Sequence, residues 1–167
     1  MEKEVRYQRW FYLFIIIHLL LWTLLPSLLR YTLPLDAMEG TTWGRQLFLG
    51  YDKNPFLNAW LTELAIWLGG KSGWLIYGLG QLCVVTAFGA VWMLVKKMLH
   101  PAYALMAVMI LEGMTNYNID AIDFNDNVLQ LAFWALIISY FYTAIKNQKL
   151  KDWLLVGLFA GLAMMAK

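Results

Sequence analysis

The chain has 167 residues, of which 61% are hydrophobic and 16% aromatic, and its mean hydropathy is +0.56. A soluble fold of this length could not bury so much apolar surface, so the composition indicates a membrane protein. The formal net charge of +2 is too small to favour nucleic acid as a partner. The single cysteine, Cys83, excludes an intrachain disulfide.

The first apolar run predicts a membrane-spanning helix over residues 10–29. It carries no formal charge, and as a helix it is long enough to cross about 30 Å of hydrocarbon. Lys3, Arg6 and Arg9 precede it, but no small-residue cleavage site follows. We therefore expect an uncleaved helix with a cytoplasmic N-terminus rather than a signal peptide. His18, in its middle, is expected to be packed or hydrogen-bonded rather than a ligand.

Further apolar segments predict spans over residues 72–95, 101–114, 128–145 and 153–166, which makes five spans in all. The short loops after 72–95 and 128–145 are rich in lysine, and the positive-inside rule places both in the cytoplasm. Their lysines are Lys96, Lys97, Lys146, Lys149 and Lys151. The predicted fold class is an all-α integral membrane protein with a multi-span helical bundle.

The segment 56–70 is also apolar, but a span there would place both lysine loops outside, against the basic N-terminus. We expect an interfacial helix on the outer surface, with its apolar face towards lipid and Glu63 towards water. Residues 30–71 then form one external loop. Most acidic residues fall on this outer side, which indicates a site at the external membrane surface. They are Asp36, Glu39, Asp52, Glu63, Asp120, Asp123 and Asp126.

The external loop carries "LPLDAMEGTTWGRQLFLGYDKNPFLNAWL", residues 33–61. The order PLDxxExxxWGRxxxxGYDKNPxLxxWL, followed by FNDN and LAFWAL, resembles the N-terminal part of bacterial family-39-type glycosyltransferases. These are integral-membrane enzymes of the GT-C architecture, related to the protein O-mannosyltransferases and the lipid A aminoarabinose transferases. Relatives often read HPPL where this chain has NPFL. They are also several hundred residues long, so we expect an N-terminal portion that is inactive alone.

The resemblance implies transfer of a sugar from a polyprenyl-phosphate donor to a lipid or cell-envelope glycan, at the outer face of the cytoplasmic membrane. Such a reaction needs a base for the acceptor hydroxyl and positive charge for the departing phosphate. Asp36 is the expected base. Glu39 shares its face if a helix starts at Asp36, and would orient the base or help hold a cation. The simpler alternative is that Asp36 only caps the helix and Glu39 is a favourable first-turn acid.

Lys53 and Arg45 are the candidate phosphate partners. Lys53 lies in the GYDKNP turn, where Gly50 and Pro55 restrict the backbone. For Arg45, snorkelling to lipid headgroups is an equal alternative. Asn125 of the FNDN motif is a third candidate for substrate binding.

The acidic cluster around Asn125 has a plainer reading: either Asn125 or Asp126 caps the helix that follows. The sequence identifies no cofactor, although a divalent cation held by Asp36, Glu39 and Asp52 stays open. Glu112, at the outer end of the third span, is interpreted as a boundary residue.

Two other functions stay open, a membrane transporter and a non-catalytic assembly subunit. The spans are poor in the paired mid-membrane charges that a transporter needs. An assembly subunit gives no reason for the ordered carboxylates and lysine of the loop.

Overall fold

The computed structural model describes residues 2–167, with the side chains of residues 4–70 and 72–167. Every regular element in this range is a helix. The α-helices are α1 (Glu2–Leu29), α2 (Leu35–Gly44), α3 (Leu57–Gly69), α4 (Trp74–Met98), α5 (Pro101–Glu112), α6 (Asp126–Asn147) and α7 (Leu150–Ala166). The short 3-10 helices are η1 (Gly70–Ser72), η2 (Thr115–Tyr117) and η3 (Asp120–Ile122).

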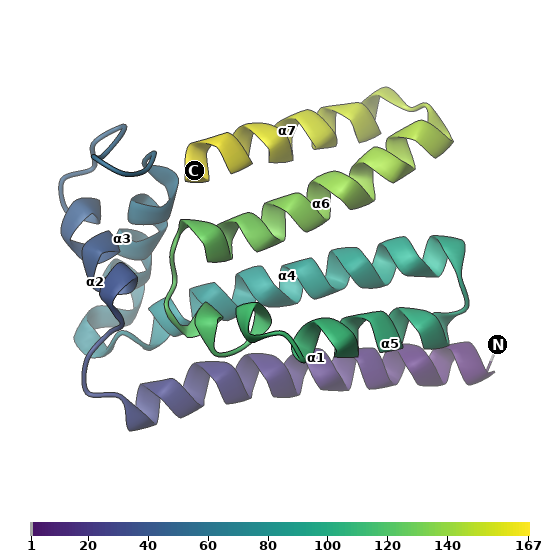
Figure 1. Cartoon of the computed structure of the whole chain (residues 1–167), viewed down its shortest axis with the longest axis horizontal. Helices are drawn as coiled ribbons and strands as arrows, with labels where there is room; N and C mark the ends of the chain where they lie inside the picture. The colour runs from purple at the N-terminus through teal and green to yellow at the C-terminus, as the bar shows by residue number, and fades with distance from the viewer. Residues whose placement is uncertain (1) are drawn as a thin grey trace.

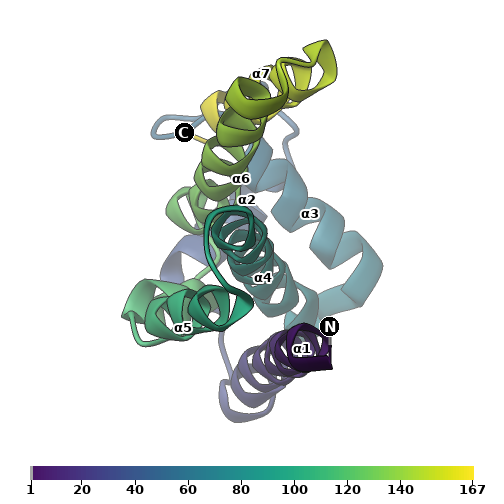
Figure 2. The same cartoon turned by 90° about the vertical axis from the view of Figure 1, so that its right-hand side faces the viewer.

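Helix α4 lies at the centre of the bundle, with α1, α5 and α6 packed around it (Figures 1 and 2). Its side chains Val84 and Phe88 are fully buried, as is Phe124 in the segment that precedes α6. Helix α7 packs back along α6, and the turn between them is closed by Gln148 in a left-handed conformation, with φ of 54°.

Three helices in the described range are long and apolar enough to cross a membrane, namely Glu4–Leu29, Trp74–Met98 and Asp126–Asn147. The prediction of an all-helical membrane bundle is therefore confirmed. The expected spans over 101–114 and 153–166 correspond to α5, with 12 residues, and α7, with 17. Since α5 rises only about 18 Å, it does not cross the hydrocarbon by itself, and five crossings stay a prediction.

The segment 113–125 follows α5 and leads to the end of the bundle at which α2 lies. In this segment η3 packs against α4, and Ala121 is fully buried. A Cβ atom on Gly80 would lie 2.4 Å from the carbonyl oxygen of Ala121, so this contact requires glycine. Irregular backbone at such a depth is tolerated because protein, and not lipid, surrounds it.

A polar network ties α5 to α1 and α4. The Nδ1 atom of His18 lies 2.7 Å from a carboxylate oxygen of Glu112, and its Nε2 atom lies 3.0 Å from Oε1 of Gln81. The indole of Trp22 donates to the other Glu112 oxygen at 3.2 Å. His18 is hydrogen-bonded, as expected. Glu112 is more than a boundary residue, because it pairs with a histidine in the middle of α1.

Helix α3 packs against α2, with glycine at the contact. A Cβ atom on Gly44 would lie 2.5 Å from the carbonyl oxygen of Ala59 and 2.8 Å from Cβ of Glu63. The expectation that Glu63 faces water is therefore wrong: it is half-buried at the contact with α2, because the small residues of α2 draw the helices together. The exposed face of α3 presents Trp67 and Leu68, as an interfacial helix against lipid would.

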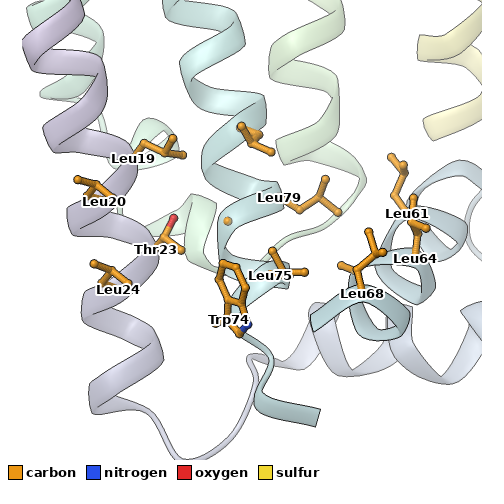
Figure 3. A pocket seen from close by; sticks show the side chains of 13 residues that line it. Leu19, Leu20, Thr23, Leu24, Leu61, Leu64, Leu68, Trp74, Leu75 and Leu79 are labelled. Atoms are coloured by element: carbon orange, nitrogen blue, oxygen red, sulfur yellow. The ribbon is translucent and has the colours of Figure 1, made fainter. Parts of the chain in front are cut away.

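An apolar groove of about 370 Å³ opens between α1, α3 and α4 (Figure 3). Leucines line most of it, and among its lining residues only Thr23 and Trp74 carry a polar side-chain atom. This surface suits hydrocarbon, but it offers no acid, base or cation. Chemistry must therefore take place elsewhere.

The two ends of the bundle differ in charge. Figure 1 shows the N-terminus, the α4–α5 turn and the α6–α7 turn at one end, with α2, α3 and the C-terminus at the other. Lys96 and Lys97 belong to the first end, while Asp36 and Glu39 lie on α2 at the second. This separation is the one that the positive-inside rule requires, although the orientation in the membrane stays a prediction.

Cysteine labelling tests that orientation. In a Cys83→Ala background, we predict that Asp52→Cys reacts with an impermeant maleimide in intact cells. Lys96→Cys should react only after permeabilisation, because basic loops are retained in the cytoplasm. The native Cys83 is 6% exposed and its removal only lowers the background. Labelling of Lys96→Cys in intact cells would reverse the topology.

Candidate active site

Asp36 lies in the first turn of α2 and contacts a segment far away in the chain. Its Oδ2 atom accepts a hydrogen bond from Nδ2 of Asn125, at 2.8 Å. Asn125 immediately precedes α6, so this bond joins the start of α2 to the start of α6. The carboxylate is half-buried and has a defined direction.

Asp36 does not cap its own helix. The N-cap residue of α2 is Pro34, with no side-chain capping bond, and the helix starts one residue earlier than expected, at Leu35. The cap comes from Asp123: its Oδ1 accepts from the backbone N–H of Ala37 at 2.9 Å, and its Oδ2 from that of Asp36 at 3.4 Å. The interpretation of Asp36 as a mere cap is therefore wrong, because a distant carboxylate already occupies the helix N-terminus.

Burial raises the pKa of the Asp123 carboxyl, while the backbone hydrogen bonds from Ala37 and Asp36 lower it and the neighbouring Asp36 charge raises it. The net direction is upward. The Asp123 carboxyl is thus partly desolvated and lies at the N-terminus of α2. The positive end of the helix dipole favours an acidic side chain there. Asp36 keeps its own carboxylate available to the cleft beside it.

Asn125 has two functions in the structure. Its Oδ1 atom accepts from the backbone N–H of Val128 at 3.0 Å, which makes it the N-cap of α6. The prediction that Asn125 or Asp126 caps this helix is thereby confirmed for Asn125. Because the oxygen is fixed by the cap, the NH₂ group must point away from α6, and there it meets Asp36.

Lys53 and Glu39 form an ion pair at the edge of the site. The ammonium lies 2.7 Å from Oε1 of Glu39, and the side chains are 65% and 31% exposed. The hydrogen bond from Lys53 to Glu39 raises the pKa of the lysine most, and the negative charge of Glu39 raises it further. The lysine therefore stays cationic. The turn that carries it is closed by a bridge between Gly50 and Pro55, the two residues expected to restrict it.

These residues line one polar cleft of about 270 Å³ at the α2 end of the bundle. The structure brings together four of the predicted site residues, namely Asp36, Glu39, Lys53 and Asn125. The remaining lining residues are Trp43, Asn54, Asn58, Asp126 and Lys167. A cleft of this size is at the lower end of small-molecule sites, which begin at roughly 300 Å³.

Arg45 and Asp52 are not part of this cleft. Both side chains are exposed: Arg45 follows the last turn of α2, and Asp52 belongs to the turn that carries Lys53. Among the described side chains, no group of three His, Cys, Asp or Glu is placed to hold a metal ion. Asp36, Glu39 and Asp52 therefore do not form a joint cation site, and Asp52 does not line the cleft.

Several residues in the cleft or beside it were not predicted from the sequence. Asp123 was recognised only as part of an acidic cluster, because a cap from a carboxylate 86 residues beyond Ala37 leaves no local pattern. Asp126 pairs with Lys167 at 3.0 Å, and that contact likewise depends on the packing of α7 on α6. Asn58 lies in an apolar helix, where a single polar residue gives no signal of its own.

The fold and the cleft define an integral-membrane protein with carboxylates, amides and a lysine gathered at one end of its helices. Residues 53–167 match the dolichyl-phosphate-mannose-protein mannosyltransferase family, and the chain belongs to this family of glycosyltransferases. The matched range includes Lys53 and Asn125, while Asp36 and Glu39 precede it. Neither a curated protein nor a solved structure matches the chain.

The cap from Asp123 generates a prediction on stability. Asp123→Ala should lower the free energy of unfolding by about 1 kcal/mol, the usual effect of losing a helix cap. Thermal unfolding in detergent measures this change. Asp120→Ala is the matched control, because Asp120 lies in the same segment but its side chain accepts from the Thr115 hydroxyl and caps no α-helix. Equal stability of the two variants would show that the cap is dispensable.

Proposed function

We propose that this chain contributes to transfer of a sugar from a polyprenyl-phosphate donor to a hydroxyl group of a lipid or cell-envelope glycan. The observation that carries the proposal is that Asp36 and Lys53 line the same cleft. Family membership supports the reaction class, because the family is named for a lipid-phosphate-linked sugar donor.

In this proposal Asp36 is the general base. As the bond between the anomeric carbon and the phosphate oxygen breaks, the acceptor oxygen bonds to that carbon and its proton passes to Asp36. Asn125 aims the carboxylate through the 2.8 Å hydrogen bond. Since neither oxygen of Asp36 is used to cap α2, the group is free to take the proton.

Lys53 stabilises the charge that develops on the departing phosphate. Its ammonium reaches the cleft and stays protonated beside Glu39. We assign Glu39 the orientation of Lys53 rather than of Asp36, because the pair is in direct contact at 2.7 Å. Arg45 and a bound cation have no part in this mechanism.

The acidic cleft lies at the opposite end of the bundle from the lysine-rich turns, which supports a site on the outer face of the cytoplasmic membrane. The cleft is open, and the Lys53 side chain is 65% exposed, so bulk water would compete with the acceptor. For that reason we expect these 167 residues to transfer no sugar by themselves. Assays therefore use the full-length protein that contains them.

Asp36→Asn tests the base. Asparagine preserves size and can still accept the Asn125 hydrogen bond, but it cannot take a proton. Transfer should fall by at least about 10²-fold, the low end for loss of a general base. Folding should hardly change, because the Asp36 side chain makes no capping bond. Initial rates at equal expression measure the effect, and turnover near that of the wild type would remove Asp36 from the mechanism.

Lys53→Met tests the phosphate contact separately. The variant keeps an apolar stem without the charge, so we predict that kcat/KM for the donor falls about tenfold, as expected when a charge-assisted hydrogen bond is lost. The KM for the acceptor should stay within about twofold. Steady-state kinetics with each substrate varied in turn separates the two. An effect confined to the acceptor would contradict the assignment of Lys53.

A further inference from the structure

Asn58 is a buried amide on the wall of the cleft. It lies in the first turn of α3, is 5% exposed, and lines the cleft with Asp36 and Lys53. Its Oδ1 atom is buried without a hydrogen-bond partner in the part of the chain that the structure describes. Its backbone carbonyl accepts from the Thr62 hydroxyl at 2.9 Å.

An amide in this state lowers stability, because desolvation of its polar atoms is not repaid by a hydrogen bond. Asn125, in the same cleft, shows the usual arrangement, with both ends of its amide bonded. Asn58 has no comparable structural task, since the N-cap of α3 is Phe56 and no side chain caps that helix. Buried polar groups without partners need a specific explanation, and a ligand supplies one.

We infer that the Asn58 amide binds a hydroxyl group of the transferred sugar. This inference rests on the proposed function and adds a binding residue to it. A primary amide carries one acceptor and one donor group side by side, which complements a hydroxyl that both donates and accepts. A phosphate or carboxylate would instead be drawn to the Lys53 ammonium in the same cleft.

The position of Asn58 favours the sugar over the acceptor. Asn58 follows Lys53 by five residues and lines the same cleft as this group, which is assigned to the phosphate. The sugar is bonded to that phosphate before transfer. In the proposed function the acceptor enters from the solvent side of the cleft, whereas Asn58 is 5% exposed and belongs to the buried wall.

Asn58→Leu separates binding from stability in the full-length protein. Leucine has nearly the same shape, and removing the unpartnered amide should leave the unfolding temperature unchanged or raise it. In this variant, kcat/KM for the donor should fall roughly 3- to 15-fold, which is the equivalent of one neutral hydrogen bond. Asn147→Leu is the matched control: Nδ2 of Asn147 donates to Asp152 at 3.2 Å, far from the cleft. That variant should lower the unfolding temperature and keep kcat/KM.

Deoxy donors identify the bound group. Polyprenyl-phosphate mannose, glucose and galactose are assayed first, and monodeoxy forms of the accepted sugar follow. One deoxy donor should lower wild-type kcat/KM by the factor seen for Asn58→Leu, and cause no further loss in that variant. The inference is overturned if every deoxy donor acts equally on both proteins, if the variant transfers like the wild type, or if its loss follows the acceptor. A wild-type protein that transfers no sugar instead sinks the proposed function, and the role of Asn58 with it.

Discussion

The carboxylate of Asp123 holds the start of α2 to the core of the bundle, and the geometry of the cleft depends on that contact. Its two oxygens accept from the N–H groups of Ala37 and Asp36, 86 and 87 residues earlier in the chain. Two residues further on, Asn125 donates to the Asp36 side chain. Backbone and carboxylate of Asp36 are therefore fixed by the same short segment. If that segment moved, both the helix end and the direction of the base would change together.

That segment can hold Asp36 only because it is itself packed against α4. Gly80 permits the carbonyl of Ala121 to approach the helix backbone, and the buried side chain of Phe124 anchors the residues before Asn125. On its other side, the pair of His18 and Glu112 ties the end of α5 to α1. A polar pair buried in a bundle is weak evidence for stability, but removing one partner leaves a costly unpaired group. The network thus fixes the position at which α5 ends, and this matters more than its contribution to the free energy of unfolding.

Much of the helical organisation is predictable from the sequence, because long apolar runs and lysine-rich turns are local patterns. The three long helices, the surface helix over 57–69 and the Asn125 cap all follow from such patterns. The orientation of Glu63 does not, because it depends on the close approach of α2 at Gly44. The role of Asp36 was likewise ambiguous, since a carboxylate after Pro34 is an ordinary cap. Only the position of Asp123 in space shows that Asp36 is not the cap, and no spacing in the chain encodes it.

The polar groups of the cleft differ in how fully the protein satisfies them. Asn125 uses both ends of its amide, and Lys53 and Asp126 each have a partner of opposite charge. These bonds pre-organise the groups around a site, which lowers the cost of ordering them when a ligand binds. Asn58 lies among them, and its Oδ1 atom has no hydrogen-bond partner within the described residues. This is unfavourable, because Asn58 is buried. Sites that bind polar ligands retain such groups at the expense of stability, because the missing partner arrives with the ligand.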